Sequence, residues 1–297
     1  MTPLLSAKPA PEMTASLLRN PVTRAAVRAA ASFPLRALGK SRAKRFGVEV
    51  SRARIAGVPV KLVRRKDIDA GAEPRLLINF HGGGFIVDSG SLTESIPIAG
   101  LTGIPVVSVM YRMAPEHPFP AAVDDALAVY RDALAHRSPT SIGVYGTSAG
   151  AILTLQLLAR IKAEGLPMPA AAGVFSGSAD LALAGDCEAF LPAILGSRTA
   201  PDVVGDYSAG TERTDPLLSP IYGDMSGFPP ALLMASTRDQ LLSQTVLADL
   251  ALRRAGVTTD LRVYEGMLHA FWAWIDCPET DDALAAQAAF FARHLCA

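Results

Sequence analysis

The chain has 297 residues, of which 50% are hydrophobic, and its 28 basic and 28 acidic residues give a formal net charge of zero. This length and composition suffice for one enzyme-sized globular body with a large buried core. No apolar stretch approaches the roughly 18 uncharged residues expected of a membrane span, and prolines and arginines interrupt residues 1–40, where a signal peptide would carry an apolar block. We therefore expect a cytoplasmic protein with no integral membrane segment.

Three widely spaced cysteines are present: Cys187, Cys277 and Cys296. Their odd number and their spacing fit neither a disulfide framework nor a metal site. We expect free thiols in a reducing compartment.

The charge is distributed unevenly along the chain. Residues 1–66 hold 15 of the 28 basic residues and only two acidic ones, Glu12 and Glu49. A basic arm can bind nucleic acid or an anionic membrane surface. No nucleic-acid-binding motif accompanies this charge, so the interpretation we favour is a helical cap whose basic face lies on or near an acidic body.

The first 45 residues are punctuated by prolines and are expected to form short helices. The next stretch, VEVSRARIAGVPVKLVRR, alternates polar and apolar residues on either side of Ala56 and Gly57. This pattern is typical of a β-hairpin at the start of a sheet.

After the hairpin, apolar segments of strand length alternate with segments of helical spacing. Strands are expected near residues 76–80, 104–110, 141–145, 170–177, 231–236 and 261–264, and helices near 92–101, 121–136, 149–165 and 241–256. Continuously apolar strands that alternate with helices predict an α/β fold with a mainly parallel central sheet flanked by helices. Active sites in such folds lie at the carboxyl ends of the strands.

Residues 181–222 break the alternation and contain four prolines. We interpret them as an insertion that joins the N-terminal helices in a second, smaller layer above the sheet, with the role of a lid. The expected organisation is a core of two parts and a helical cap of two parts: cap residues 1–45 and 181–222, and core residues 46–180 and 223–297.

The sequence GTSAG, residues 146–150, lies between an expected strand and an apolar helix. This is the context of a nucleophile elbow, where glycines permit a sharp turn and the serine is held in a strained conformation with its hydroxyl exposed. Ser148 is therefore the candidate nucleophile. An ordinary tight turn before a helix is the alternative.

A serine hydroxyl needs a base to remove its proton and a third group to orient that base. Of the five histidines, His269 follows a strand, so a parallel sheet would deliver it to the same edge as Ser148. Asp239 also follows a strand, whereas Asp260 precedes one and faces the opposite edge. The order Ser148, Asp239, His269 is the nucleophile, acid, base order of α/β-hydrolases.

The sequence HGGGF, residues 81–85, follows the expected strand 76–80. Backbone amides can approach a substrate closely only where no side chain intervenes, and preorganised amides stabilise a developing oxyanion by roughly 3 to 4 kcal/mol each. Gly83 and Gly84 are candidate donors, with the amide of Ala149 as a third. A flexible loop is the alternative.

Five motifs together resemble the hormone-sensitive lipase-like family of bacterial carboxylesterases within the α/β-hydrolase fold. In chain order they are HGGGF, YRMAPEHPFPAAVDD, GTSAG, STRDQLL and MLHAF. The resemblance covers residues from about 70 to the C-terminus. It implies the triad Ser148, Asp239 and His269, the oxyanion hole Gly83, Gly84 and Ala149, and a structural His81 that holds the glycine loop by hydrogen bonding.

The chain departs from the family pattern around the nucleophile, where Ala151 also differs, and after Asp239. Thr147 stands before Ser148, where much of the family has aspartate, and this resembles the branch whose signature is GTSAG. Ser243 and Gln244 follow Asp239 at positions where many relatives carry an acidic residue. The second departure leaves open what supports the predicted pair Asp239 and His269.

The resemblance implies hydrolysis of esters with acyl chains of roughly two to eight carbons, through an acyl-enzyme and without cofactor or metal. Lactones, aryl acetates and acetamides remain open, because one triad can serve them all. A non-catalytic small-molecule receptor and a membrane-surface protein are the alternatives from other classes. We expect a small-molecule ester as partner, no nucleic acid, and a homodimer.

Overall fold

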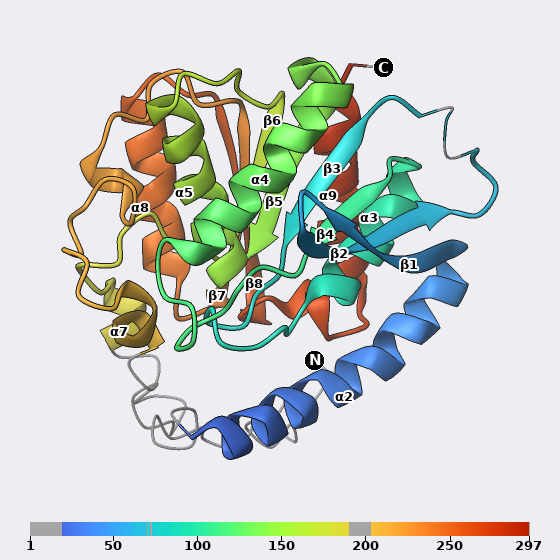
Figure 1. The fold of residues 1–297 in the computed structure, drawn as a ribbon, viewed down its shortest axis with the longest axis horizontal. Coiled ribbons are helices and arrows are strands. Elements are labelled where there is room, and N and C mark those ends of the chain that lie inside the picture. The colour runs from blue at the N-terminus through green and yellow to red at the C-terminus, as the bar shows by residue number, and fades with distance from the viewer. Residues whose placement is uncertain (1–19, 70, 72, 190–202, 297) are drawn as a thin grey trace.

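The computed structural model describes residues 20–69, 71, 73–189 and 203–296. A sheet of eight strands forms its centre, in the order β1-β2-β4-β3-β5-β6-β7-β8 (Figure 1). The first two pairings are antiparallel and every pairing from β4 to β8 is parallel. The strands are β1 (Val48–Ile55), β2 (Val58–Arg65), β3 (Leu76–Phe80), β4 (Val106–Val109), β5 (Ile142–Thr147), β6 (Ala171–Phe175), β7 (Ala231–Arg238) and β8 (Thr259–Leu268).

Helices cover both faces of the sheet. The described helices are α2 (Pro21–Arg45), α3 (Ser91–Thr102), α4 (Ala121–His136), α5 (Ala149–Ala163), α7 (Val203–Ser208), α8 (Leu242–Arg254) and α9 (Pro278–His294), with 3-10 turns η1 (Pro139–Ser141), η2 (Pro220–Tyr222) and η3 (Phe271–Ala273). Two apolar clusters result, one with α4, α5 and α8 and the other with α3 and α9. The α/β fold expected from the alternating pattern is therefore confirmed.

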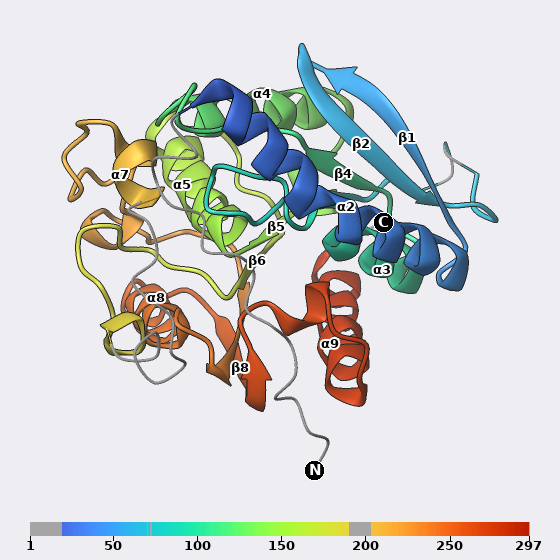
Figure 2. The same ribbon diagram turned by 90° about the horizontal axis from the view of Figure 1, so that it is seen from below.

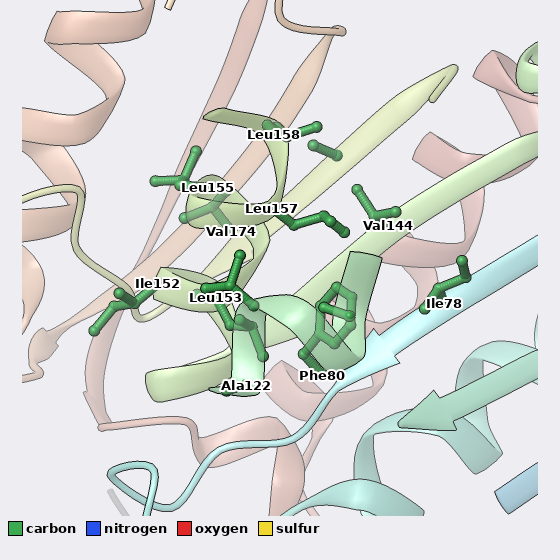
Figure 3. Close-up of a cluster of buried hydrophobic side chains, with 14 of the residues drawn as sticks. Ile78, Phe80, Ala122, Val144, Ile152, Leu153, Leu155, Leu157, Leu158 and Val174 are labelled. Carbon is green, nitrogen blue, oxygen red and sulfur yellow. The ribbon is translucent and has the colours of Figure 1, made fainter. Parts of the chain in front are cut away.

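Side chains from a single strand reach both clusters. In β3, Ile78 and Phe80 pack under α4 and α5 (Figure 3), whereas Leu77 packs on the side of α3 and α9. Every residue of β3, β4, β5 and β6 is buried. Burial on both faces explains why these strands are continuously apolar instead of alternating.

The N-terminal segment differs from its prediction. Residues 21–45 form one helix, α2, which continues through Pro34 instead of breaking there. An interior proline costs a helical hydrogen bond and roughly 3 kcal/mol. Arg28 on one side of Pro34 and Arg42 on the other bind the body of the protein, and these contacts hold the helix together. The predictions for residues 1–19 lie outside the described residues.

The basic residues of α2 face acidic residues of the body. Four arginines form ion pairs: Arg24 and Arg28 with Glu116, Arg42 with Asp276, and Arg45 with Asp281. The favoured interpretation of the basic segment, a helix lying on an acidic body, thus describes residues 21–45. Among the described helices, none is both long and apolar enough to cross a membrane.

Arg42 is the most enclosed of these arginines, with 2% of its surface exposed. Its Nη1 donates to the carbonyl oxygens of Thr93 at 3.0 Å, Trp272 at 2.9 Å and Ala273 at 3.3 Å. These acceptors come from α3 and from the turn η3. A single guanidinium therefore joins α2 to two separate segments of the core.

Arg42→Met is expected to lower the free energy of unfolding by roughly 3 kcal/mol, because it leaves buried carbonyl groups without a donor. Urea unfolding followed by circular dichroism measures the change. Arg36 is exposed on the same helix, so Arg36→Met is the control and should change stability by no more than about 0.5 kcal/mol. Equal effects of the two substitutions would show that the Arg42 contacts do not stabilise the fold.

Candidate active site

Ser148 occupies a sharp turn between β5 and α5. Its φ of 57° and ψ of −122° are strained for a residue with a side chain. At this turn α5 lies so close to the end of β3 that only glycine fits at residue 150. A Cβ on Gly150 would lie 1.8 Å from the carbonyl oxygen of Phe80. A Cβ on Gly146 would likewise lie 2.3 Å from the backbone of Gly150. Both glycines of GTSAG are therefore required by packing, as a nucleophile elbow demands.

Asp239 and His269 are in direct contact. The His269 Nδ1 donates to Oδ1 of Asp239 at 2.7 Å, and the amide of Leu241 donates to the same oxygen at 2.8 Å. The Asp239 side chain is fully buried, while 19% of the His269 side chain is exposed. The ring is thus oriented by a buried carboxylate and still open to solvent on one side.

These two residues lie nearer their strands than the sequence indicated. The prediction placed Asp239 three residues past its strand and His269 across a short loop. Instead, β7 ends at Arg238 and β8 at Leu268, so each residue follows its strand immediately. Polar residues such as Thr237, Arg238 and Glu265 hid the extra length, because the apolar pattern stops before the hydrogen-bonded ladder does.

The loop that carries His269 is tied to the elbow. Trp272 Nε1 donates to Oγ1 of Thr147, the residue before Ser148, at 3.3 Å. Among the described residues, no hydrogen bond joins the His269 ring to the Ser148 hydroxyl, and the ring's bond runs to Asp239. Such bonds are often formed only when substrate is present. The structure thus brings Asp239 and His269 together and places Ser148 on an adjoining loop.

The glycine loop lies against Ser148. A Cβ on Gly82 would lie 3.4 Å from the Cβ of Ser148. Gly83 and Gly84 have φ of 119° and 62°, and a Cβ on Gly83 would lie 1.9 Å from the carbonyl oxygen of Val87, so the loop requires glycine. The amides of Gly83, Gly84 and Ala149 donate to no acceptor among the described residues, which leaves them available to a ligand.

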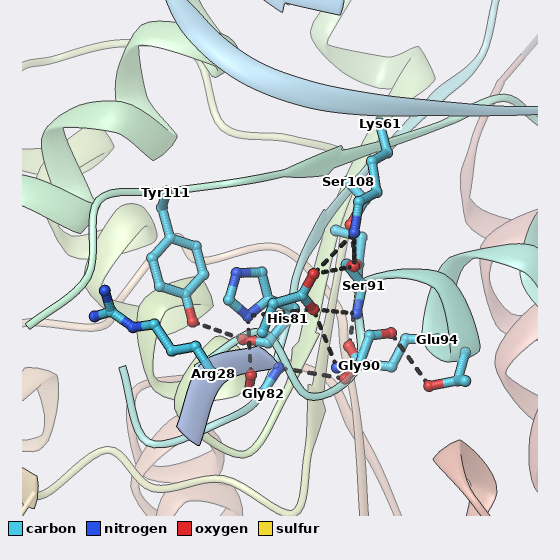
Figure 4. A network of polar contacts seen from close by, with 12 residues as sticks. Arg28, Lys61, His81, Gly82, Gly90, Ser91, Glu94, Ser108 and Tyr111 are labelled. Atoms are coloured by element: carbon cyan, nitrogen blue, oxygen red, sulfur yellow. Dashed lines mark hydrogen bonds and ion pairs between the residues drawn. The ribbon is translucent and has the colours of Figure 1, made fainter. Parts of the chain in front are cut away.

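The buried side chain of His81 supports the glycine loop. Its Nδ1 donates to the carbonyl oxygen of Gly82 at 2.8 Å, and its ring stacks on Tyr111 at 4.2 Å (Figure 4). The Tyr111 hydroxyl donates to the His81 carbonyl oxygen at 2.7 Å. Burial lowers the pKa of His81, although nearby Asp88 raises it in part. A neutral, buried ring fits the structural role that the resemblance implies for His81.

Ser176 is a site residue that the sequence reasoning missed. It follows β6 directly, has φ of 49°, and its hydroxyl donates to Oδ2 of Asp239. The amide of Ala270, next to His269, donates to the same hydroxyl at 3.4 Å. Its position just after a strand was the signal that could have identified it. Ser176 thus supports Asp239 through Oδ2, whereas His269 contacts Oδ1.

Ser243 and Gln244 do not provide this support. The Ser243 hydroxyl donates to Sγ of Cys187, and Gln244 Nε2 donates to the carbonyl oxygen of Leu183 and to Glu188. Both residues therefore hold the segment that begins the insertion. The carboxylate of Asp239 is supported instead by the Ser176 hydroxyl and the Leu241 amide.

The pKa values of the pair move in opposite directions. Burial raises the pKa of Asp239, but the charge and hydrogen bond of His269 and the Ser176 hydroxyl outweigh it, so the net pKa is lowered. For His269, burial lowers the pKa, while the charge and hydrogen bond of Asp239 raise it more, to above 6.5. The pair can therefore stabilise a proton on the imidazole.

Asp239→Asn is expected to lower the pKa of His269, because it removes the charge that raises that pKa and leaves the burial that lowers it. Proton NMR titration of the imidazole measures this shift. An unchanged His269 pKa in the variant would contradict the electrostatic role assigned to Asp239.

Residues 77–273 match the protein family described as alpha/beta hydrolase fold. An acetyl-hydrolase of Streptomyces hygroscopicus is 34% identical over 206 residues, which cover 67% of this chain and 69% of that protein. The crystal structure of an esterase matches with a TM-score of 0.85 and 34% identity, covering 97% of this chain and 92% of the other. An esterase of the bacterial hormone-sensitive lipase family matches with a TM-score of 0.79 and 26% identity, covering 96% and 100%. The chain therefore belongs to the α/β-hydrolase family and, within it, to the hormone-sensitive lipase-like bacterial carboxylesterases.

Proposed function

We propose that this carboxylesterase hydrolyses short- to medium-chain acyl esters through an acyl-enzyme on Ser148. The observation that carries the proposal is the Asp239–His269 hydrogen bond of 2.7 Å beside the strained elbow of Ser148. The unpaired amides of Gly83, Gly84 and Ala149 supply the second requirement, donors for an oxyanion. In this proposal the nucleophile, the base and the oxyanion donors all belong to this chain, and water is the second substrate.

The first step forms the acyl-enzyme. His269 Nε2 takes the proton of the Ser148 hydroxyl as Oγ attacks the ester carbonyl, and Asp239 stabilises the imidazolium that forms. The carbonyl oxygen becomes negative and accepts hydrogen bonds from the three amides. When the carbon–oxygen bond to the alcohol breaks, His269 gives the proton to the leaving oxygen.

The second step releases the acid. His269 removes a proton from water, whose oxygen attacks the acyl carbon, and the same amides stabilise the second oxyanion. The proton then returns from His269 to Ser148 as the ester bond to the enzyme breaks. Lactone and aryl-acetyl or acetamide hydrolysis would use the same groups, because only the leaving group differs.

We assign residues 1–45 and 181–222 to a cap over the site. Two contacts support this assignment for the described part of the insertion: Tyr207 of α7 stacks on Phe85 of the HGGGF motif with ring centroids 3.6 Å apart, and its carbonyl oxygen accepts from the amide of Phe119 at 2.8 Å. On the other side, Arg28 of α2 donates to the carbonyl oxygen of Ile86 at 2.7 Å. A layer packed this closely on the oxyanion loop favours small acyl groups.

A homodimer in the cytoplasm is the assembly we propose. β8 is an edge strand, and its Val263 is 44% exposed. On the neighbouring helix α8, Val246, Leu247 and Leu250 are also exposed. An exposed apolar surface beside an open strand edge fits pairing with a second copy. We propose neither a nucleic-acid partner nor a receptor function.

Ser148→Ala should reduce kcat for ester hydrolysis by at least about 10³-fold, because the nucleophile is lost while the amides remain. Release of nitrophenol from nitrophenyl acetate measures the rate, and circular dichroism checks the fold. Ser51→Ala, at an exposed position of β1, is the control and should keep full activity. If Ser148→Ala keeps most of its turnover, Ser148 is not the nucleophile.

The proposed cap predicts a preference for short acyl chains. Across a series of nitrophenyl esters, we expect kcat/KM for acyl chains of two to eight carbons to exceed that for twelve carbons by about tenfold or more. Lactones and an acetanilide measured alongside distinguish the other hydrolase activities. A higher kcat/KM for the longest esters would contradict the proposed role of the cap.

A further inference from the structure

Glu94 is a buried carboxyl beside the proposed active site that the mechanism does not use. It lies in the first turn of α3 and is 3% exposed. Its Oε1 accepts from the amide of Gly82 at 3.3 Å, and its Oε2 accepts from Nδ2 of Asn79 at 3.2 Å. Figure 4 shows Glu94 on the side of the glycine loop opposite Tyr111.

The surroundings are shaped to hold this side chain. A Cβ on Gly90 would lie 1.7 Å from Oε1 of Glu94, so only glycine leaves room for the carboxyl at that point. The Glu94 amide donates to the Gly90 carbonyl oxygen at 2.8 Å. Behind it, Asn79 is fixed in turn, because its Oδ1 accepts from the Ser108 hydroxyl at 2.9 Å.

The Glu94 carboxyl also lies near the nucleophile elbow, which is bonded to the His269 loop. The side chain of Thr147 is one of the groups that oppose the rise in the pKa of Glu94. The Thr147 hydroxyl oxygen accepts from Trp272 Nε1 at 3.3 Å. Glu94 therefore contacts the glycine loop directly and lies next to the residue that joins the nucleophile elbow to the His269 loop.

We propose that Glu94 is a positioning residue: its carboxyl fixes the Gly82 peptide, and thereby holds the Gly83 and Gly84 amides where the oxyanion forms beside Ser148. This inference rests on the proposed function of Ser148 and of those amides. The Gly82 amide itself is occupied by Glu94, which explains why the hole uses the next two glycines. Misplaced amides stabilise the transition state less while changing substrate binding little, so the effect falls on kcat.

The protonation of Glu94 should be visible in the pH dependence of kcat. Burial and, to a smaller extent, the charge of Asp88 raise the pKa of Glu94 to about 8, although interactions with Asn79, Gly82 and Thr147 oppose the rise. The other titratable and charged groups near Glu94 are already paired or have shifted pKa values. Lys61 is bound to Asp88 at 2.8 Å, and Arg42 donates to the Thr93 carbonyl oxygen. Burial lowers the pKa of His81 and raises the pKa values of Tyr111 and Tyr145. An ionised Glu94 would place a negative charge near the oxyanion, so kcat should fall as pH rises through about 8.

The test compares Glu94→Gln and Glu94→Met with wild type, using nitrophenyl acetate between pH 6 and 10. Glu94→Met removes both acceptors at similar volume, and we expect kcat to fall by about tenfold or more with KM within about threefold. Glu94→Gln keeps one acceptor oxygen, so it should retain more activity than Glu94→Met and lose the alkaline decrease near pH 8. Glu49→Gln, at an exposed position of β1, is the control and should match wild type in both respects.

Two results would overturn the inference. One is a folded Glu94→Met variant with wild-type kcat. The other is a Glu94→Gln variant that keeps the alkaline decrease, and this result decides the matter even if Glu94→Met does not fold. The inference and the proposed function fail separately: an active Ser148→Ala removes the function, whereas an inactive Ser148→Ala with unaffected Glu94 variants removes only the positioning role.

Discussion

Parallel strand pairing is the constraint on which the site depends. The register aligns Phe80 with Gly146, Thr147 with Phe175, and Arg238 with Leu268, so the strands end along one edge. The residues that directly follow β3, β5, β6, β7 and β8 all belong to the proposed site: His81, Ser148, Ser176, Asp239 and His269. Strand pairing thus brings segments that are far apart in the chain to one edge of the sheet.

Much of this arrangement could be predicted from the sequence. The continuously apolar strands and the helical segments between them gave the parallel sheet, and a parallel sheet places strand-following residues on one edge. That reasoning, together with the GTSAG motif, predicted that Ser148, Asp239 and His269 follow strands at this edge, and each does follow a strand there. It underestimated the length of β7 and β8 because polar residues interrupt the apolar pattern, Thr237 and Arg238 in β7 and Glu265 in β8, although both strands continue through them.

The supporting residues could not be predicted in the same way. Ser176 carried one signal, its position just after a strand, but its partner Asp239 lies on another segment. Glu94 also acts through partners on other segments, and nothing in its local sequence distinguishes a buried hydrogen-bonding glutamate from an exposed one. The path of α2 through Pro34 was missed for the same reason, because tertiary contacts outweigh a local preference. Sequence patterns report which face of an element is apolar, whereas the partner of a buried polar group is set by the completed fold.

The basic residues of helix α2 bind loops next to the proposed site. It crosses in front of the sheet when the molecule is seen from below (Figure 2). Arg28 donates to the carbonyl oxygen of Ile86, just after the glycine loop, and Arg42 donates to that of Trp272, in the turn after His269. Exposed ion pairs contribute little to stability, so the bonds to backbone carbonyls are the more important part of this contact. The basic N-terminal segment thus holds two loops of the site from outside the sheet.

The central claim is that hydroxyl, imidazole and glycine amides converge on one reacting carbon. A crystal structure of the enzyme inactivated by a phosphonate ester, which forms a stable tetrahedral adduct with an active serine, tests this most directly. The account predicts phosphorus bonded to Ser148, its free oxygen about 3 Å from the amides of Gly83, Gly84 and Ala149, and His269 within hydrogen-bonding reach of the adduct. An adduct on another residue, or a phosphonyl oxygen directed away from those amides, would contradict it.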